Sequence, residues 1–147
     1  MKKNYVLLFF ILISIIVFSQ DNSKNLKSLK VQLSKEVVDT SKVTVFIKIA
    51  DYYKSKENDS SFIYYEKAVQ LAIKSDSKIQ LAGAYRKSGS NYSNSNNSIK
   101  ALENYQNSVS IYENLGLQSE IARLYNLIGL TYSDLRSEDK AIQFHLK

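Results

Sequence analysis

The apolar residues of this chain recur at the spacing of amphipathic helices. Leu102, Tyr105, Val109 and Tyr112 fall on one helical face. A second stripe of the same spacing consists of Leu124, Ile128, Tyr132 and Leu135. The chain contains no proline that would interrupt such helices, and no strand-like alternation of apolar and polar residues competes with them. The pattern therefore predicts an all-α protein after the N-terminal segment.

Short polar segments separate the predicted helices. They are rich in Ser, Asn, Asp and Lys, whose side chains compete for backbone hydrogen bonds and so favour turns and helix starts. The segments read SKENDS, SNSNNS and LRSEDK. We predict that Ser60, Ser98 and Ser137 are the N-caps of the helices that follow, and that Gly116 ends a helix in the left-handed conformation. Two helices joined by a turn then form one unit.

A shift of 40 residues aligns the chain with itself without a gap. The coinciding positions preserve size class and are Tyr52 with Tyr92 and Tyr132, Ser61 with Ala101 and Ala141, and Gly89 with Gly129. A fixed period of this length is typical of stacked repeats, so the sequence predicts an α-solenoid of antiparallel helix pairs. We interpret the eight residues as packing positions, because glycine lets helices approach closely while tyrosine and alanine interleave large with small.

These positions resemble the motif of the tetratricopeptide repeat (TPR) family. The third copy carries Tyr125, Ile128 and Gly129 at motif positions, and His145 stands where the family prefers Phe or Tyr. In the first copy, the stretch YYEKAVQLA is similar to the family's second helix. The period exceeds the usual length of about 34 residues and the late proline is missing. Both departures resemble a variant of the family with lengthened helices.

The N-terminus has the features of a secretory signal. Lys2 and Lys3 precede an apolar run of about fourteen residues, which would reach only about 21 Å as a helix, against about 30 Å for a bilayer core. We therefore expect a signal peptide over residues 1–19, cut after Ser19, and export to the periplasm or the exterior. An uncleaved N-terminal anchor, which would bring the protein to the membrane, is the alternative.

The remaining chain divides into a cap and three copies of the repeat. Leu26, Leu29 and Leu33 lie at helical spacing within an expected N-terminal capping helix. The expected segments are 20–41 for the cap, 42–81 and 82–121 for two complete copies, and 122–147 for an incomplete third. Because AIQFHLK stops inside a predicted helix, we expect either a truncated chain or one that continued into further repeats.

The composition offers little for catalysis. There is no cysteine, and His145 is the single histidine, so no cysteine- or histidine-based metal site can be completed. The four glycines lie too far apart for a phosphate-binding loop. The formal charge of +6 falls to +4 without Lys2 and Lys3, a mild excess that gives a weak basis for a nucleic-acid partner. We expect no enzyme activity, no cofactor and no metal.

The TPR resemblance implies a concave groove that binds a protein or peptide. The groove residues expected to make contact are Phe46, Tyr53, Arg86, Ser90, Arg123 and Asn126. The family's carboxylate-clamping set of Lys, Asn and Arg is not reproduced, because Phe46, Ala50 and Leu130 stand at key places. We predict a non-enzymatic, exported interaction scaffold. The alternative is the truncated sensory region of a TPR-containing histidine kinase or transcriptional regulator.

Overall fold

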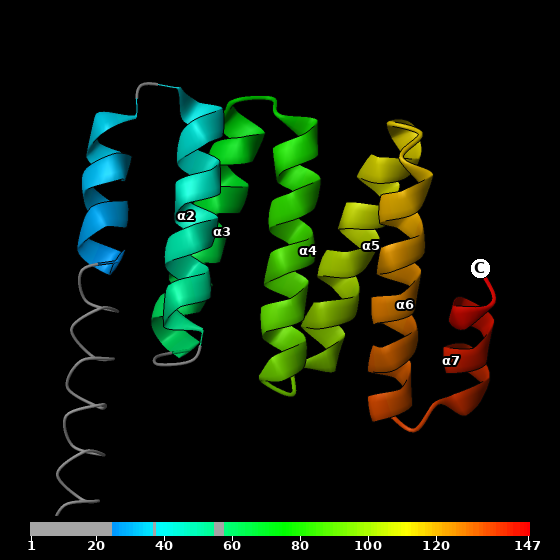
Figure 1. The fold of residues 1–147 in the computed structure, drawn as a ribbon. Coiled ribbons are helices and arrows are strands. Elements are labelled where there is room, and N and C mark those ends of the chain that lie inside the picture. Colours follow the sequence, from blue (N-terminus) through cyan, green and yellow to red (C-terminus); the bar gives the residue numbers. More distant parts are fainter. Residues whose placement is uncertain (1–24, 37, 55–57) are drawn as a thin grey trace, which may run out of the picture. The chain divides into compact units, whose positions relative to one another are not determined.

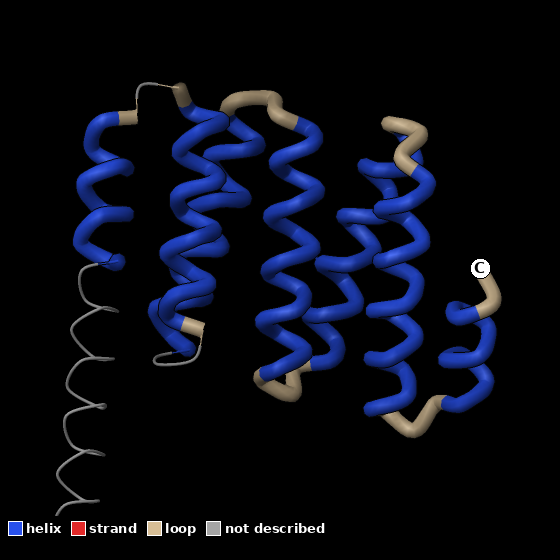
Figure 2. The backbone as a smooth tube through the Cα atoms, in the orientation of Figure 1, coloured by secondary structure: helices blue, strands red, loops and turns tan. Residues whose placement is uncertain are grey.

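The computed structural model describes residues 25–36, 38–54 and 58–147, so the predicted signal segment lies outside the described residues. Within these ranges the regular structure is entirely helical, which confirms the all-α prediction (Figure 2). The chain divides into two compact units between Lys35 and Glu36. In the first unit residues 25–35 are helical. The second contains α2 (Asp39–Tyr53), α3 (Asn58–Lys74), α4 (Lys78–Asn94), α5 (Ser98–Asn114), α6 (Gln118–Asp134) and α7 (Glu138–His145).

Within the second unit, each helix packs against the next in the chain (Figure 1). The helices form two rows, with α2, α4 and α6 in one and α3, α5 and α7 in the other. Neighbours in the first row contact each other directly, whereas those in the second row do not. In a curved stack the row with the closer helices lies on the inner side, so α2, α4 and α6 form the inner row.

Four turns reverse the chain with the same backbone conformation. Gly116 has φ +69°, as predicted for the end of a helix, and the amide of Leu117 donates to the carbonyl of Tyr112 at 3.0 Å. This pair of features defines a Schellman turn. The equivalent left-handed residues of the other three turns are Asp76, Asn96 and Arg136. The sequence pattern missed these three because only Gly116 is a glycine.

The turn geometry corrects the predicted N-caps. Ser60 lies inside α3, which begins at Asn58, so that prediction is wrong. Ser98 is the first residue of α5; Asn97 is the N-cap, and its side chain accepts a hydrogen bond from the Lys100 amide at 3.3 Å. The Schellman turn fixes the cap one residue after the left-handed position, which excludes Ser98. Ser137 does precede α7, but its hydroxyl makes no capping hydrogen bond.

Helix pairs approach closely at two glycines. A Cβ atom added at Gly89 would lie 2.8 Å from the Tyr105 ring and 3.1 Å from the backbone carbonyl of Ala101. A Cβ atom at Gly129 would lie 2.7 Å from the imidazole of His145. The small residues of the second helices, Ser61, Ala101 and Ala141, are buried.

The three equivalent tyrosines are half-buried. Tyr92 stacks on Phe62 with ring centroids 4.7 Å apart, and Tyr132 stacks on Phe144 at 5.6 Å. The ammonium group of Lys100 lies 5.3 Å from the centroid of the Tyr92 ring, and that of Lys140 lies 5.2 Å from the centroid of the Tyr132 ring. Tyr52 instead makes an edge contact with its neighbour Tyr53 at 5.3 Å.

The hairpins differ in the side chains that lie between their own two helices. Val43 of α2 and Ala72 of α3 are buried in the first hairpin, and the residues 40 positions later, in the second hairpin, are Gly83 of α4 and Tyr112 of α5. The hydroxyl of Tyr112 comes within 4.0 Å of the Cβ position at Gly83, so the large side chain uses space that the glycine leaves.

The interface between α3 and α4 holds a buried polar contact. The amide nitrogen of Asn91 donates to the Ser61 hydroxyl at 2.8 Å, and both side chains are fully buried. The amide oxygen of Asn91 is buried without a hydrogen-bond partner. Forty residues later, Thr131 and Ala101 take the same positions, and the threonine hydroxyl donates to the Leu127 carbonyl of its own helix. Of these two equivalent pairs, only Asn91 and Ser61, between α3 and α4, are therefore joined by a side-chain hydrogen bond.

The left-handed turns predict opposite effects for two substitutions. Gly116→Ala places a Cβ at φ +69° and should lower the free energy of unfolding by about 1 kcal/mol. Arg136→Gly removes a Cβ at φ +55° and should raise it by about 0.5 kcal/mol, because the relieved strain slightly exceeds the entropy that glycine loses. Urea unfolding of both variants measures the difference, and equal signs would contradict the role given to these turns.

The two close approaches should respond differently to an added methyl group. Gly89→Ala forces the methyl against a buried ring and a backbone carbonyl, so it should destabilise the protein by about 1 to 3 kcal/mol. Gly129→Ala meets the exposed His145 side chain, which can move, so the gain in helix propensity should offset the contact. Thermal unfolding of the two variants provides the comparison, and equal loss of stability would show that the contacts do not differ.

Candidate functional site

The predicted groove residues of α2 are both engaged by α3. Tyr53 stacks on Tyr64 with ring centroids 5.7 Å apart and planes 9° apart, and Phe46 lies 6.2 Å from the same ring. Phe46 also lines a cavity of about 580 Å³ together with Ile63 and Leu71 of α3. Phe46 and Tyr53 therefore both lie against the ring of Tyr64 on α3.

The residues of α4 form a polar cluster with tyrosines of α5. Tyr105 donates its hydroxyl hydrogen to Ser90 at 3.2 Å, and Ser90 donates to the Arg86 carbonyl at 3.1 Å. Burial raises the pKa of Tyr105 and of Tyr112, and the Arg86 guanidinium opposes this rise at both phenols. Arg86 is half-buried, and its Nε atom is buried without a hydrogen-bond partner. Arg86 is therefore held in place by the tyrosines and retains an unused donor.

The residues of α6 are more exposed. The Arg123 side chain is 69% exposed and pairs with Glu120 one turn earlier, with 3.3 Å between nitrogen and oxygen. Asn126 is also exposed. Exposed ion pairs within a helix contribute little stability, so Arg123 can exchange Glu120 for another acid at small cost. Arg86 and Arg123 thus differ in exposure: the first is half-buried, and the second is mostly exposed.

A second polar network on the inner row was missed from the sequence. Tyr65 donates its hydroxyl hydrogen to the Asp51 carboxylate, whose other oxygen lies 2.9 Å from the ammonium of Lys87. The network joins α2, α3 and α4 across 36 residues of sequence. The sequence offered one signal for this network, because Asp51 directly follows Ala50 and Lys87 directly follows Arg86, both at positions expected to line the groove. Because Asp51 neutralises Lys87, Arg86 is the cation in the middle of α4 that is left for a ligand.

The described residues contain no group of three or more His, Cys, Asp or Glu side chains that could hold a metal ion. In the same part of the chain, every helix is too short or too polar to cross a bilayer. The candidate site is therefore a set of hydrogen-bond donors on the inner-row helices that is supported by tyrosines of α3 and α5.

Comparison with known proteins identifies the fold but not a family. No protein-family model and no curated protein sequence matches the chain. Among solved structures, the TPR domain of Arabidopsis FLU is similar with a TM-score of 0.68 and 17% identity, over 74% of this chain and 92% of that domain.

Two further solved structures are similar. BtubC from P. vanneervenii has a TM-score of 0.68 at 18% identity, and MamA has 0.61 at 23% identity. They match 85% and 84% of this chain, which spans 52% of BtubC and 64% of MamA. The described helices therefore have the fold of a TPR-like helical-repeat domain.

The buried tyrosines predict a loss of stability at alkaline pH. Burial raises the pKa of Tyr65, and the Asp51 carboxylate raises it further. An unfolded tyrosine ionises near pH 10, so the folded protein keeps protons that the unfolded chain releases above that value. The stabilising contribution of Tyr65 should be fully present below about pH 10 and should decrease above that value. Urea midpoints measured across this range, with tyrosinate absorbance followed in parallel, provide the test.

The matched variant for this test is Tyr65→Phe, which removes one protected phenol. It should show a shallower decline of stability above about pH 10 than the unaltered protein. An identical slope in both proteins would exclude Tyr65 as a source of the pH dependence.

Proposed function

We propose that residues 42–147 form a non-enzymatic scaffold that binds a protein or peptide, built from TPR-type helix pairs of the lengthened-helix variant with a period of 40 residues. The similarity to TPR domains supports the class of fold. The helices α3 to α7 begin at Asn58, Lys78, Ser98, Gln118 and Glu138, at intervals of 20 residues, and this regular spacing supports the proposed period.

The observation that carries the proposal is the state of Arg86 on the inner row. Its guanidinium is positioned beside Tyr105 and Tyr112, and its Nε has no partner among the protein atoms. Guanidinium groups form their strongest hydrogen bonds with carboxylates, and Arg86 as a whole is only half-buried. A ligand that supplies an acidic side chain or a backbone carbonyl can bind the accessible part of this side chain, whereas the Nε atom is buried within the protein.

The partner is accordingly a peptide segment that lies across α4 and α6. Its acidic or carbonyl oxygen contacts Arg86, and Arg123 provides a second, adaptable donor after release of Glu120. Ser90 of α4 and Asn126 of α6 have shorter side chains, and they add polar contacts to the same peptide segment. Phe46 and Tyr53, held against Tyr64, offer an apolar surface on α2 for the part of the peptide that extends toward α2.

We further propose that the protein acts outside the cytoplasm after removal of residues 1–19. The support is the sequence alone, in which a charged start, a short apolar run and small residues before Gln20 follow the order of a secretory signal. N-terminal sequencing of protein recovered from the cell envelope would identify Gln20 as the first residue if cleavage occurs after Ser19.

A peptide array tests the binding function. Immobilised peptides of acidic, neutral and basic composition are probed with the protein, and the affinity of the strongest binder is then measured for the variants. Arg86→Ala should weaken binding by at least about tenfold, since a charge-assisted hydrogen bond contributes more than about 1.4 kcal/mol. Arg123→Ala should weaken it by less, because the side chain is exposed and already paired.

Lys87→Ala is the matched control, since it removes a cation from the next position of α4 that is already neutralised by Asp51. Its affinity should equal that of the unaltered protein within about twofold. Equal affinities for the Arg86 and Lys87 variants, or a preference for basic peptides, would refute the role of Arg86.

A further inference from the structure

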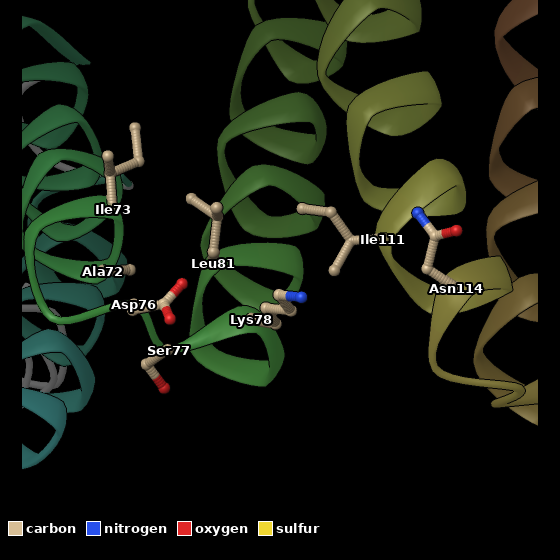
Figure 3. Close-up of a pocket in the computed structure, with 8 residues that line it drawn as sticks. All are labelled: Ala72, Ile73, Asp76, Ser77, Lys78, Leu81, Ile111 and Asn114. Carbon is tan, nitrogen blue, oxygen red and sulfur yellow. The ribbon is translucent and has the colours of Figure 1, made fainter.

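A cavity of about 440 Å³ lies between α3, α4 and α5, apart from the polar cluster at Arg86 (Figure 3). Its apolar wall is formed by Ile73 of α3, Leu81 of α4 and Ile111 of α5, whose side chains surround the same space. Because α3 and α5 do not pack against each other, the beginning of α4 forms the floor between them. A cavity of this size accommodates a small apolar group.

The cavity is not a consequence of the repeat. Its wall residue Ile73 is 50% exposed, and 40 residues later the chain has Glu113, which is exposed as well. This position changes from apolar to charged between the two copies. Stacking therefore does not require isoleucine at this position, so its exposed side chain is available to a ligand in the cavity.

The rim restricts the chemistry of a ligand. Asp76 and Lys78 line the cavity with opposite charges, and the side-chain amide of Asn114 provides both a donor and an acceptor. These charges sum to zero, so the rim favours neither an anionic nor a cationic ligand. A neutral group that carries its own N–H and C=O finds a partner for each, which is the pattern of a peptide backbone.

We infer that this cavity binds one aliphatic side chain of a partner protein, flanked by its uncharged peptide groups, as a second site distinct from the inner-row face. The side chain enters between Ile73, Leu81 and Ile111, and the adjacent amides bond to the rim. Two sites on different sides of the same hairpins allow the scaffold to hold two segments at once.

Methyl NMR of isoleucine-labelled protein provides the test. The probe is N-acetyl-leucine methylamide, and the charged comparisons are N-acetyl-leucine, which is anionic, and leucine methylamide, which is cationic. The neutral probe should produce saturable shifts of the Ile73 and Ile111 methyl signals, with weaker binding of both charged compounds. Ile73→Glu copies the residue of the next repeat and should weaken binding by at least about tenfold, because it places a carboxylate in the apolar wall.

Ile99→Asp is the matched control, because it copies Asp139 of the next repeat at an isoleucine that is 79% exposed and does not line the cavity. It should leave the affinity for the neutral probe unchanged. Absence of saturable shifts, tighter binding of either charged compound, or equal losses for the two variants would overturn the inference. Arg86→Ala should not alter probe binding, so failure here and failure of the inner-row proposal are distinguishable.

Discussion

The left-handed turn residue is the constraint on which the rest of this structure depends. At each of the four turns a residue with positive φ lets the two closing hydrogen bonds form, and the next helix begins two residues later. The four helices α3 to α6 consequently have the same length of 17 residues. From α3 to α6, equal helices and equal turns bring equivalent faces together, so the small residues meet where the backbones need them.

Close approach within the hairpins also determines where ligands can bind. The contacts at Gly89 and Gly129 draw α4 toward α5 and α6 toward α7, and the tyrosine hydroxyls of α5 reach the polar residues of α4. The inner row is continuous, whereas α3 and α5 stay apart. The same packing thus produces a donor-rich face on one side and an apolar cavity between helices on another.

The sequence was sufficient for those features that depend on neighbours in the chain. Helical periodicity predicted the all-α fold, and glycine marked the turn at Gly116 because its lack of a Cβ is visible in the sequence. The caps at Ser60 and Ser98 were predicted wrongly, since serine favours a cap only where the turn geometry puts it. Asp76 and Asn96 belong to residue types that adopt positive φ more readily than most, but other Asn and Asp residues of the chain are helical, and Arg136 carries no such signal.

Features that combine distant helices were beyond prediction from one sequence. Phe46 and Tyr53 were assigned to the groove by counting along the helix, but the packing of α2 against α3 brings both rings to Tyr64. The pairing of Asp51 with Lys87 depends on how α2 and α4 are placed, and neither residue is unusual in sequence. The cavity at Ile73 needs three helices at their final separation, which no spacing rule specifies.

The unequal filling of the two interfaces has an evolutionary consequence. Asn91 donates a hydrogen bond to Ser61 in the junction of α3 with α4, whereas Thr131 and Ala101 take the equivalent positions in the junction of α5 with α6. A genetic exchange that duplicated or reordered hairpins would join surfaces that were not adjusted to each other, leaving voids or an unpaired amide. The hairpins therefore share a common spacing, but they are not interchangeable, because each one fits its own neighbour.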